Sequence, residues 1–371
     1  MVEIEMTPQF GATAACLLLT PYANENLEHH LPHPLRARTL AWLEPHREHA
    51  CAKLFRELVA QGAFGSYFYA SAAWMTPSAP FQWIRPASEI DLPEAIMGGS
   101  YLSLLTSFLE EAKLLQLWES VAPQRAAVAQ QCREALRRYR VEEWLASFWG
   151  APPRRLVLVP NPTDPPDFGF GPSSAAGAFA IVGPPAVPKD TPEESRETRF
   201  RYDVDDAVAD LAVHEFGHAY LHAVRNSIST VADKHAEVGR SLPLQDWFPR
   251  RYSRWSLQLE EIMLRAAQAT WRAETISRSS AHEYVTRESE RFGLTVLPSI
   301  YCALLDKRQR GALLGPEGVL QTVAEALTRF SPPSPPGGTS SALRAVPRRP
   351  DTAPRSRMRF RILPTSAGET Q

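Results

Sequence analysis

The clearest chemical signal in the sequence is the segment His214-Glu215-Phe216-Gly217-His218, an HExxH pattern. Residues four apart in an α-helix lie on one face, one turn above the other, so both imidazoles can reach one metal ion. Zinc suits these donors, because its catalytic sites combine histidines and a carboxylate with a water molecule. Glu215 lies beside the line of ligands, where its carboxylate can take a proton from that water. The segment therefore predicts a Zn²⁺ site with His214 and His218 as ligands and Glu215 as the catalytic base.

The residues around this segment predict that it lies in a helix spanning about 205–224. Asp203, Asp205 and Asp206 supply a cap and first-turn acids for the start of the helix. Apolar side chains surround the rest of it, which is typical of a helix in a protein interior. An unliganded pair of histidines would be costly there, so the pattern favours a metal site over ordinary core histidines.

The third metal ligand decides the class of site, and the residues alone leave it open. Val224 stands where a metzincin would carry its third histidine, which excludes that arrangement. His222 shares a helix face with His214 but lies about 12 Å from it along the axis, too far to bind the same ion. A carboxylate from a second helix is the remaining solution, and the candidates are Glu260, Glu261 and Asp246.

The HEFGH segment and the later Glu261-Ile-Met-Leu-Arg265-Ala266 together resemble an uncharacterised bacterial family of zinc metallopeptidases. That family is a domain of unknown function grouped with the glutamate zincins, or gluzincins, and its pattern is HEFxH followed by ExxxRA. The resemblance extends over about residues 1–330, and the HEFGH segment is its specific part. It implies a zincin-like fold and a zinc-dependent metalloendopeptidase that hydrolyses a peptide or protein substrate.

The resemblance also implies roles for individual residues. It makes His214, His218 and Glu261 the metal ligands and Glu215 the catalytic base. Arg265 stands where better-known gluzincins place a carboxylate that orients a histidine, so it is expected to hold Glu261 or a substrate carbonyl instead.

Peptide hydrolysis also needs a group that stabilises the oxyanion, usually a tyrosine, histidine or arginine opposite the metal. The sequence does not rank the candidates, which are Tyr252, His235, His282 and Tyr301.

The elements that must position these residues are mostly helices. Helical periodicity occurs over 8–19, 35–60, 101–118, 123–149, 205–224, 254–273, 279–292, 295–307 and 315–330. Segments 2–6, 156–159 and 178–182 have strand patterns, and the prolines that flank the last two place them near a sheet edge. We therefore expect an α+β fold, predominantly helical and zincin-like, with a small β-sheet beside the active-site helix. One edge of that sheet could align an extended peptide by strand addition.

Proline content divides the chain, since many of its 33 prolines gather in two segments, 151–192 and 331–371. We expect a mainly helical N-terminal region over 1–150 and a zincin-like metal-binding catalytic region over 151–330, which can be continuous with the first. The segment 331–371 is expected to be a disordered tail rich in proline and arginine.

Charge, hydropathy and cysteine content exclude several classes of partner. The 40 basic and 41 acidic side chains nearly cancel, which removes an electrostatic case for nucleic acid. The sequence has no apolar run of about 18 residues and an acidic N-terminus, so we expect no membrane span and a cytoplasmic protein, with export left open if the true start lies upstream. The four cysteines lie far apart and favour buried thiols, with one bridge left open: Cys16, Cys51, Cys132 and Cys302.

Two hypotheses for function follow from these observations. The first is a zinc-dependent metallopeptidase in which Glu215 is the general base. The second is a non-catalytic zincin-like binding or regulatory protein that retains zinc. The intact Glu215 favours the first, because a purely structural zinc site has no use for a base beside an open coordination position.

Overall fold

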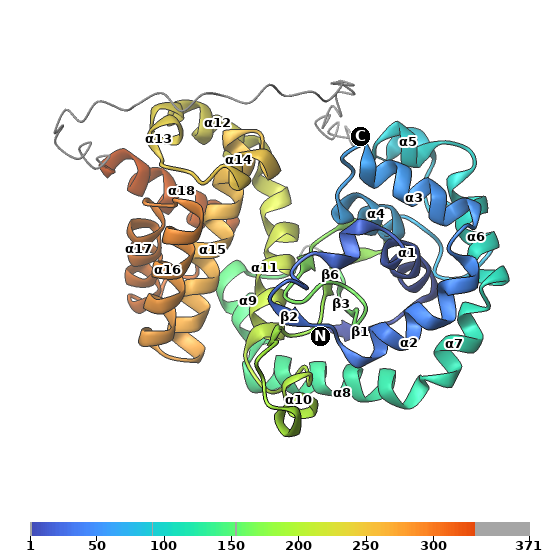
Figure 1. Ribbon diagram of the computed structural model, residues 1–371. Helices are drawn as coiled ribbons and strands as arrows, with labels where there is room; N and C mark the ends of the chain where they lie inside the picture. Colours follow the sequence, from blue (N-terminus) through green and yellow to red (C-terminus); the bar gives the residue numbers. More distant parts are fainter. Residues whose placement is uncertain (1, 91, 153, 331–371) are drawn as a thin grey trace, which may run out of the picture.

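The structure is a computed structural model that describes residues 2–330 apart from 91 and 153, so the expected tail over 331–371 lies outside the described residues. The fold is α+β and predominantly helical, as the sequence predicted (Figure 1). None of the helices in these described ranges is long and apolar enough to cross a membrane.

The helices and strands follow one another with short connections. The helices of the first half are α1 (Pro8–Leu18), α2 (Pro34–Leu43), α3 (Ala50–Ala60), α4 (Gly65–Ala73), α5 (Glu94–Met97), α6 (Tyr101–Glu111), α7 (Leu114–Ser120), α8 (Ala122–Arg138) and α9 (Val141–Trp149). The strands are β1 (Glu3–Ile4), β2 (His30–Leu31), β3 (Leu156–Pro160), β4 (Gly169–Phe170), β5 (Ser173–Ser174), β6 (Gly177–Val182) and β7 (Val187–Pro188). The later helices are α10 (Glu193–Arg199), α11 (Ala207–Leu221), α12 (Arg225–Lys234), α13 (Ala236–Ser241), α14 (Trp247–Arg251), α15 (Trp255–Thr275), α16 (Arg278–Phe292), α17 (Leu297–Gln309) and α18 (Gly315–Arg329).

Two of the long helices expected from periodicity are each broken in two. The helix expected over 35–60 consists of α2 and α3, because Pro45 interrupts it within a short 3₁₀ turn. The helix expected over 123–149 consists of α8 and α9, because Arg140 adopts a left-handed conformation with φ of 50° between them. This break redirects the chain so that α9 leads into β3.

The central sheet has the strand order β1-β3-β6-β4, with β5 also paired to β6. β3 runs parallel to both β1 and β6, whereas β4 and β5 run antiparallel to β6. The two predicted strands therefore lie in the sheet interior, and the expectation of an edge position is wrong. The parallel pairing extends to Pro160 opposite Val182, because a proline at the last strand position gives up only one ladder hydrogen bond.

Both faces of the sheet are covered by helices, which explains why its central strands are apolar throughout. On one face, Leu158 and Ala180 belong to the same core as Phe216 of α11. On the other face, Val157 and Phe179 belong to the core of the N-terminal helices, and the ring of Phe179 lies 5.1 Å from that of Phe10 in α1. The expected sheet beside the helix of HEFGH is therefore present.

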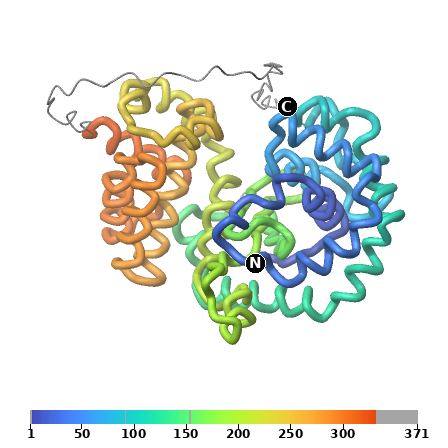
Figure 2. Tube along the Cα trace, in the orientation of Figure 1, coloured from blue at the N-terminus to red at the C-terminus, as the bar shows by residue number. Residues whose placement is uncertain are grey.

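The sheet joins segments that are far apart in the sequence. The N-terminal strand β1 pairs with β3, so Glu3 lies opposite Val157. Figure 2 shows the N-terminal segment, in blue, beside the green strands that follow residue 150. The regions 1–150 and 151–330 thus contribute to one sheet.

The helix α15 lies at the centre of the C-terminal helices and is buried along most of its length. It packs against α11 on one side and against α16 and α17 on the other. Gly217 allows the close approach to α11, because a Cβ atom at this position would collide with the side chain of Leu264. This packing brings the second half of the expected site to the first.

Candidate metal centre

Two crossing helices bring the three expected metal ligands together. His214 and His218 lie one turn apart on α11, with ring centroids separated by 5.2 Å. Glu261 of α15 faces both rings, and its carboxylate oxygens lie 3.5 Å from Nε2 of His214 and 3.5 Å from Nε2 of His218. Tetrahedral zinc with bonds of about 2.0–2.2 Å requires ligand atoms about 3.3–3.6 Å apart. The observed separations therefore fit a zinc ion without rearrangement.

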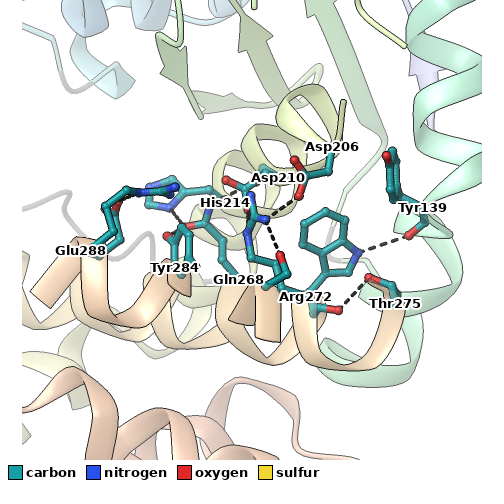
Figure 3. A network of polar contacts seen from close by, with 12 residues as sticks. Tyr139, Asp206, Asp210, His214, Gln268, Arg272, Thr275, Tyr284 and Glu288 are labelled. Carbon is teal, nitrogen blue, oxygen red and sulfur yellow. Dashed lines mark hydrogen bonds and ion pairs between the residues drawn. The ribbon is translucent and has the colours of Figure 1, made fainter. Parts of the chain in front are cut away.

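Ion pairs between α11 and α15 fix this crossing. Arg272 of α15 donates from Nε to Asp210 of α11 at 3.0 Å and also pairs with Asp206, as Figure 3 shows. The carboxylate of Asp206 therefore bonds another helix, and the expectation that it caps its own helix is wrong, because its side chain makes no capping bond. The two helices are held together one turn before the histidines.

Gln268 fixes the orientation of the His214 imidazole. Its amide nitrogen donates to the backbone carbonyl of Asp210 at 3.1 Å, so its oxygen faces the ring. That oxygen lies 2.9 Å from Nδ1 of His214 and also accepts from the hydroxyl of Tyr284 at 2.5 Å (Figure 3). Since the oxygen can only accept, the proton of the neutral imidazole lies on Nδ1 and the lone pair on Nε2 faces Glu261.

Glu260 does the same for His218. Its carboxylate oxygen lies 3.0 Å from Nδ1 of this ring, while the carboxylate of the next residue, Glu261, faces Nε2. Two consecutive glutamates thus contact the two nitrogens of one imidazole. Glu260 is buried against the ring that it orients, so the geometry favours Glu261 over Glu260 as the third ligand.

Arg265 holds the carboxylate of Glu261, which was one of the two roles expected for it. Its guanidinium donates to the Oε2 atom of Glu261 at 2.7 Å and lies 3.3 Å from a carboxylate oxygen of Glu288. Burial alone would raise the pKa of Glu261, but the neighbouring His214 and Arg265 keep that pKa well below its ordinary range. Glu261 therefore remains a charged ligand at neutral pH.

The donor set fits a catalytic metal site. Two imidazole nitrogens and one carboxylate are three protein ligands, which leaves a fourth tetrahedral position for water or substrate. Within the part of the chain that the structure describes, no other group of histidine, cysteine and acidic side chains converges in this way. His222 and Asp246 stay outside the group, and the Asp246 carboxylate points to solvent beside Arg250.

Glu215 lies beside the ligands, against the edge strand β4. Its side chain is buried, and a Cβ atom at Gly169 would lie 2.5 Å from its Oε1 atom. A Cβ atom at Gly171 would collide with the backbone carbonyl of Glu215. Burial raises the pKa of Glu215, while the charges of His214 and His218 lower it. A carboxylate with a raised pKa is suited to taking up and releasing a proton.

Of the four expected oxyanion-stabilising residues, the structure brings only Tyr252 to this site. Burial raises the pKa of its hydroxyl, and the charges of Glu261 and Glu215 raise that pKa further, which places the hydroxyl in the same electrostatic environment. His282 and Tyr301 lie against each other on α16 and α17, with ring centroids 5.9 Å apart. His235 is the residue that follows α12.

Sequence reasoning missed the two glycines over Glu215 and the orienting role of Gln268. A signal for Gln268 existed, since it lies two helical turns after Glu261 and therefore on the same helix face. The alternation of glycine and aromatic residues from Phe168 to Gly171 was a second signal, because glycine in a strand marks close approach of another backbone.

Comparison of the chain with protein-family models, curated proteins and solved structures gives no match. The functional argument therefore rests on the geometry of the site.

Proposed function

We propose that this protein is a zinc-dependent metallopeptidase of the gluzincin type, with a zincin-like fold around the α11–α15 pair. The observation that supports it best is the spacing of 3.5 Å between the Glu261 carboxylate and each histidine Nε2 atom. In the zincins a glutamate from a second helix completes an HExxH site, and the resemblance of HEFGH and ExxxRA to that group supports the same reading. His214, His218 and Glu261 would hold the ion.

Zinc at this position would act as a Lewis acid on the scissile carbonyl and lower the pKa of the attacking water. Glu215 takes the proton from that water as its oxygen attacks the carbonyl carbon. It then delivers the proton to the departing amine when the C–N bond breaks. Tyr252 donates a hydrogen bond from its hydroxyl to the carbonyl oxygen as negative charge develops there.

The strand β4 would align the substrate. In the described part of the sheet it is the terminal strand, paired on one side with β6. An extended peptide paired with its outer edge would pass Glu215, because Gly169 and Gly171 lie directly against that residue. The His218 side chain, which is 24% exposed compared with 12% for His214, marks the side that solvent and substrate can reach.

The proposal is tested by zinc content and peptide cleavage. Purified wild-type protein should contain about one zinc per chain and cleave members of a mixed peptide library. His214→Ala should lose the zinc, whereas the matched control His222→Ala should keep it. Glu215→Gln should keep the zinc and lose hydrolysis by about 10²-fold or more.

Three results would contradict the proposal or part of it. Zinc retained by His214→Ala would remove the ligand assignment. Full hydrolysis by Glu215→Gln would remove the role of that residue as base. Stoichiometric zinc with no cleavage of any peptide would instead indicate a non-catalytic zincin-like protein that binds or regulates a partner.

A further inference from the structure

Arg251, the last residue of α14, connects the C-terminal helices to the N-terminal ones beside the candidate site. Its guanidinium carbon lies 5.8 Å from the centre of the Phe64 ring, which precedes α4, and 5.5 Å from that of Trp247. Both aromatic rings are largely exposed, with 43% of Phe64 and 50% of Trp247 accessible to solvent. The cation is thus held between two aromatic side chains that a ligand can touch.

The N–H groups of Arg251 have no acceptor among the described residues, either as a hydrogen bond or as an ion pair. The neighbouring arginines are different, since Arg250 lies 3.6 Å from Asp246 and Arg265 binds Glu261. Contact of a guanidinium with a ring face leaves its in-plane donors available. These donors match a carboxylate, which accepts two parallel hydrogen bonds from one guanidinium.

The charge of Arg251 acts on the groups proposed for catalysis. It lowers the pKa of Glu215 and of the adjacent Tyr252, although burial raises both. It also lowers the pKa of Glu25, an exposed side chain of the N-terminal region that forms no ion pair with it in the described structure. A peptide lying along β4 past Glu215 would therefore come within reach of this cation.

We propose that Arg251 binds a carboxylate of the peptide substrate and makes peptides with a carboxylate close to the scissile bond the preferred substrate class. This inference rests on the proposed peptidase function. The carboxylate is either an aspartate or glutamate side chain or the C-terminus of the peptide. Phe64 and Trp247 pack against the residue that carries it.

The test uses the peptide that wild-type protein cleaves best in a mixed library. Four versions are compared, with glutamate or glutamine near the scissile bond and with a free or an amidated C-terminus. We expect one of the two neutralisations to lower kcat/KM by about 10–100-fold for the wild type, and the one that does identifies the source of the carboxylate. With Arg251→Gln that difference disappears, whereas the control Arg250→Gln keeps it.

A charge reversal separates recognition from damage to the fold. Arg251→Glu should prefer a version with lysine in place of the recognised glutamate, a gain that misfolding cannot produce. Equal cleavage of all four peptides by the wild type would overturn the inference and leave the peptidase proposal standing.

Binding of the same fluorescent peptides, measured by polarisation, distinguishes the two proposals when nothing is cleaved. Binding of the acidic peptide that depends on Arg251, without any hydrolysis, would support this inference and refute the peptidase. The absence of both binding and hydrolysis would refute both.

Discussion

The contact between the edge strand β4 and Glu215 predicts that a single methyl group can remove activity without unfolding the protein. In Gly169→Ala the added Cβ atom would lie 2.5 Å from the Oε1 atom of Glu215. A carbon and an oxygen need about 3.2 Å or more, so the carboxylate must move by roughly 0.7 Å. The atom in conflict is the end of a side chain, which can rotate away, so the cost in stability should stay below about 2 kcal/mol.

Activity should fall much more than stability, because a displacement of about 1 Å in a catalytic group can cost about 10²-fold in rate. The assay is kcat/KM on the best-cleaved peptide, together with zinc content and the melting temperature. The matched control is Gly99→Ala, since a Cβ atom at Gly99 has open space around it. Gly169→Ala should lose about 10²-fold in kcat/KM with its zinc retained, and Gly99→Ala should keep full activity.

A double variant checks the cause of this loss. In the Glu215→Gln background, Gly169→Ala should have little further effect, because both changes act through the same side chain. Undiminished hydrolysis by Gly169→Ala, in protein that contains zinc, would show that β4 does not constrain Glu215 and would refute the reasoning. Loss of zinc in this variant would also refute it, since no ligand lies in the path of the new methyl group.

Three further predictions concern residues around the site and in the core. Gln268→Ala should weaken zinc binding by about 10–100-fold, measured by competition with a chelating dye, because His214 loses the acceptor that orients it. Reaction with a thiol reagent should modify Cys302 alone in the native protein, because the other three cysteines are buried; the expectation of buried thiols is wrong for Cys302, which the structure leaves exposed. Burial raises the pKa of Asp164 to about 7 from its ordinary 3.8, so the folded state binds the extra proton between these values and the free energy of unfolding should fall as pH rises from about 4 to about 7. Chemical denaturation across that pH range should show the slope, and Asp164→Asn should flatten it.

The parts of the fold and site that follow from short-range patterns could be predicted from the sequence. The helix of HEFGH was one of them, because its apolar residues and its two histidines repeat within a few turns. The strands β3 and β6 were another, since each is a short apolar run between turn residues. Their place in the sheet interior could not be predicted, because it depends on pairing with β1, which begins more than a hundred residues earlier.

Contacts between distant segments set the remaining features. The strand β4 has two residues and no strand propensity of its own, so only its pairing with β6 makes it a strand. Arg251 meets Phe64 only because α14 folds back toward the N-terminal helices. The breaks at Pro45 and Arg140 were of a different kind, since the proline was visible in the sequence and the left-handed arginine was not.

The choice between Glu260 and Glu261 shows why an alignment of motifs is not enough to assign a ligand. Consecutive residues on a helix point about 100° apart, so only one of them can face the metal when α15 crosses α11. The other reaches around the His218 ring to Nδ1. Both are buried and both contact this histidine, so their chemical environments differ mainly in which nitrogen they face.

That difference predicts two distinct outcomes for the same substitution. Glu261→Gln replaces a charged ligand by a neutral amide and should abolish stoichiometric zinc binding. Glu260→Gln keeps an oxygen that can accept from Nδ1 of His218, so it should retain zinc with an affinity lowered by about 10-fold, because the ring becomes less basic. Zinc titration of both variants, with circular dichroism to verify folding, measures the contrast. If Glu260→Gln lost the metal and Glu261→Gln kept it, the ligand would be the first of the two glutamates, and the geometry at Nε2 would have to arise from a site without metal.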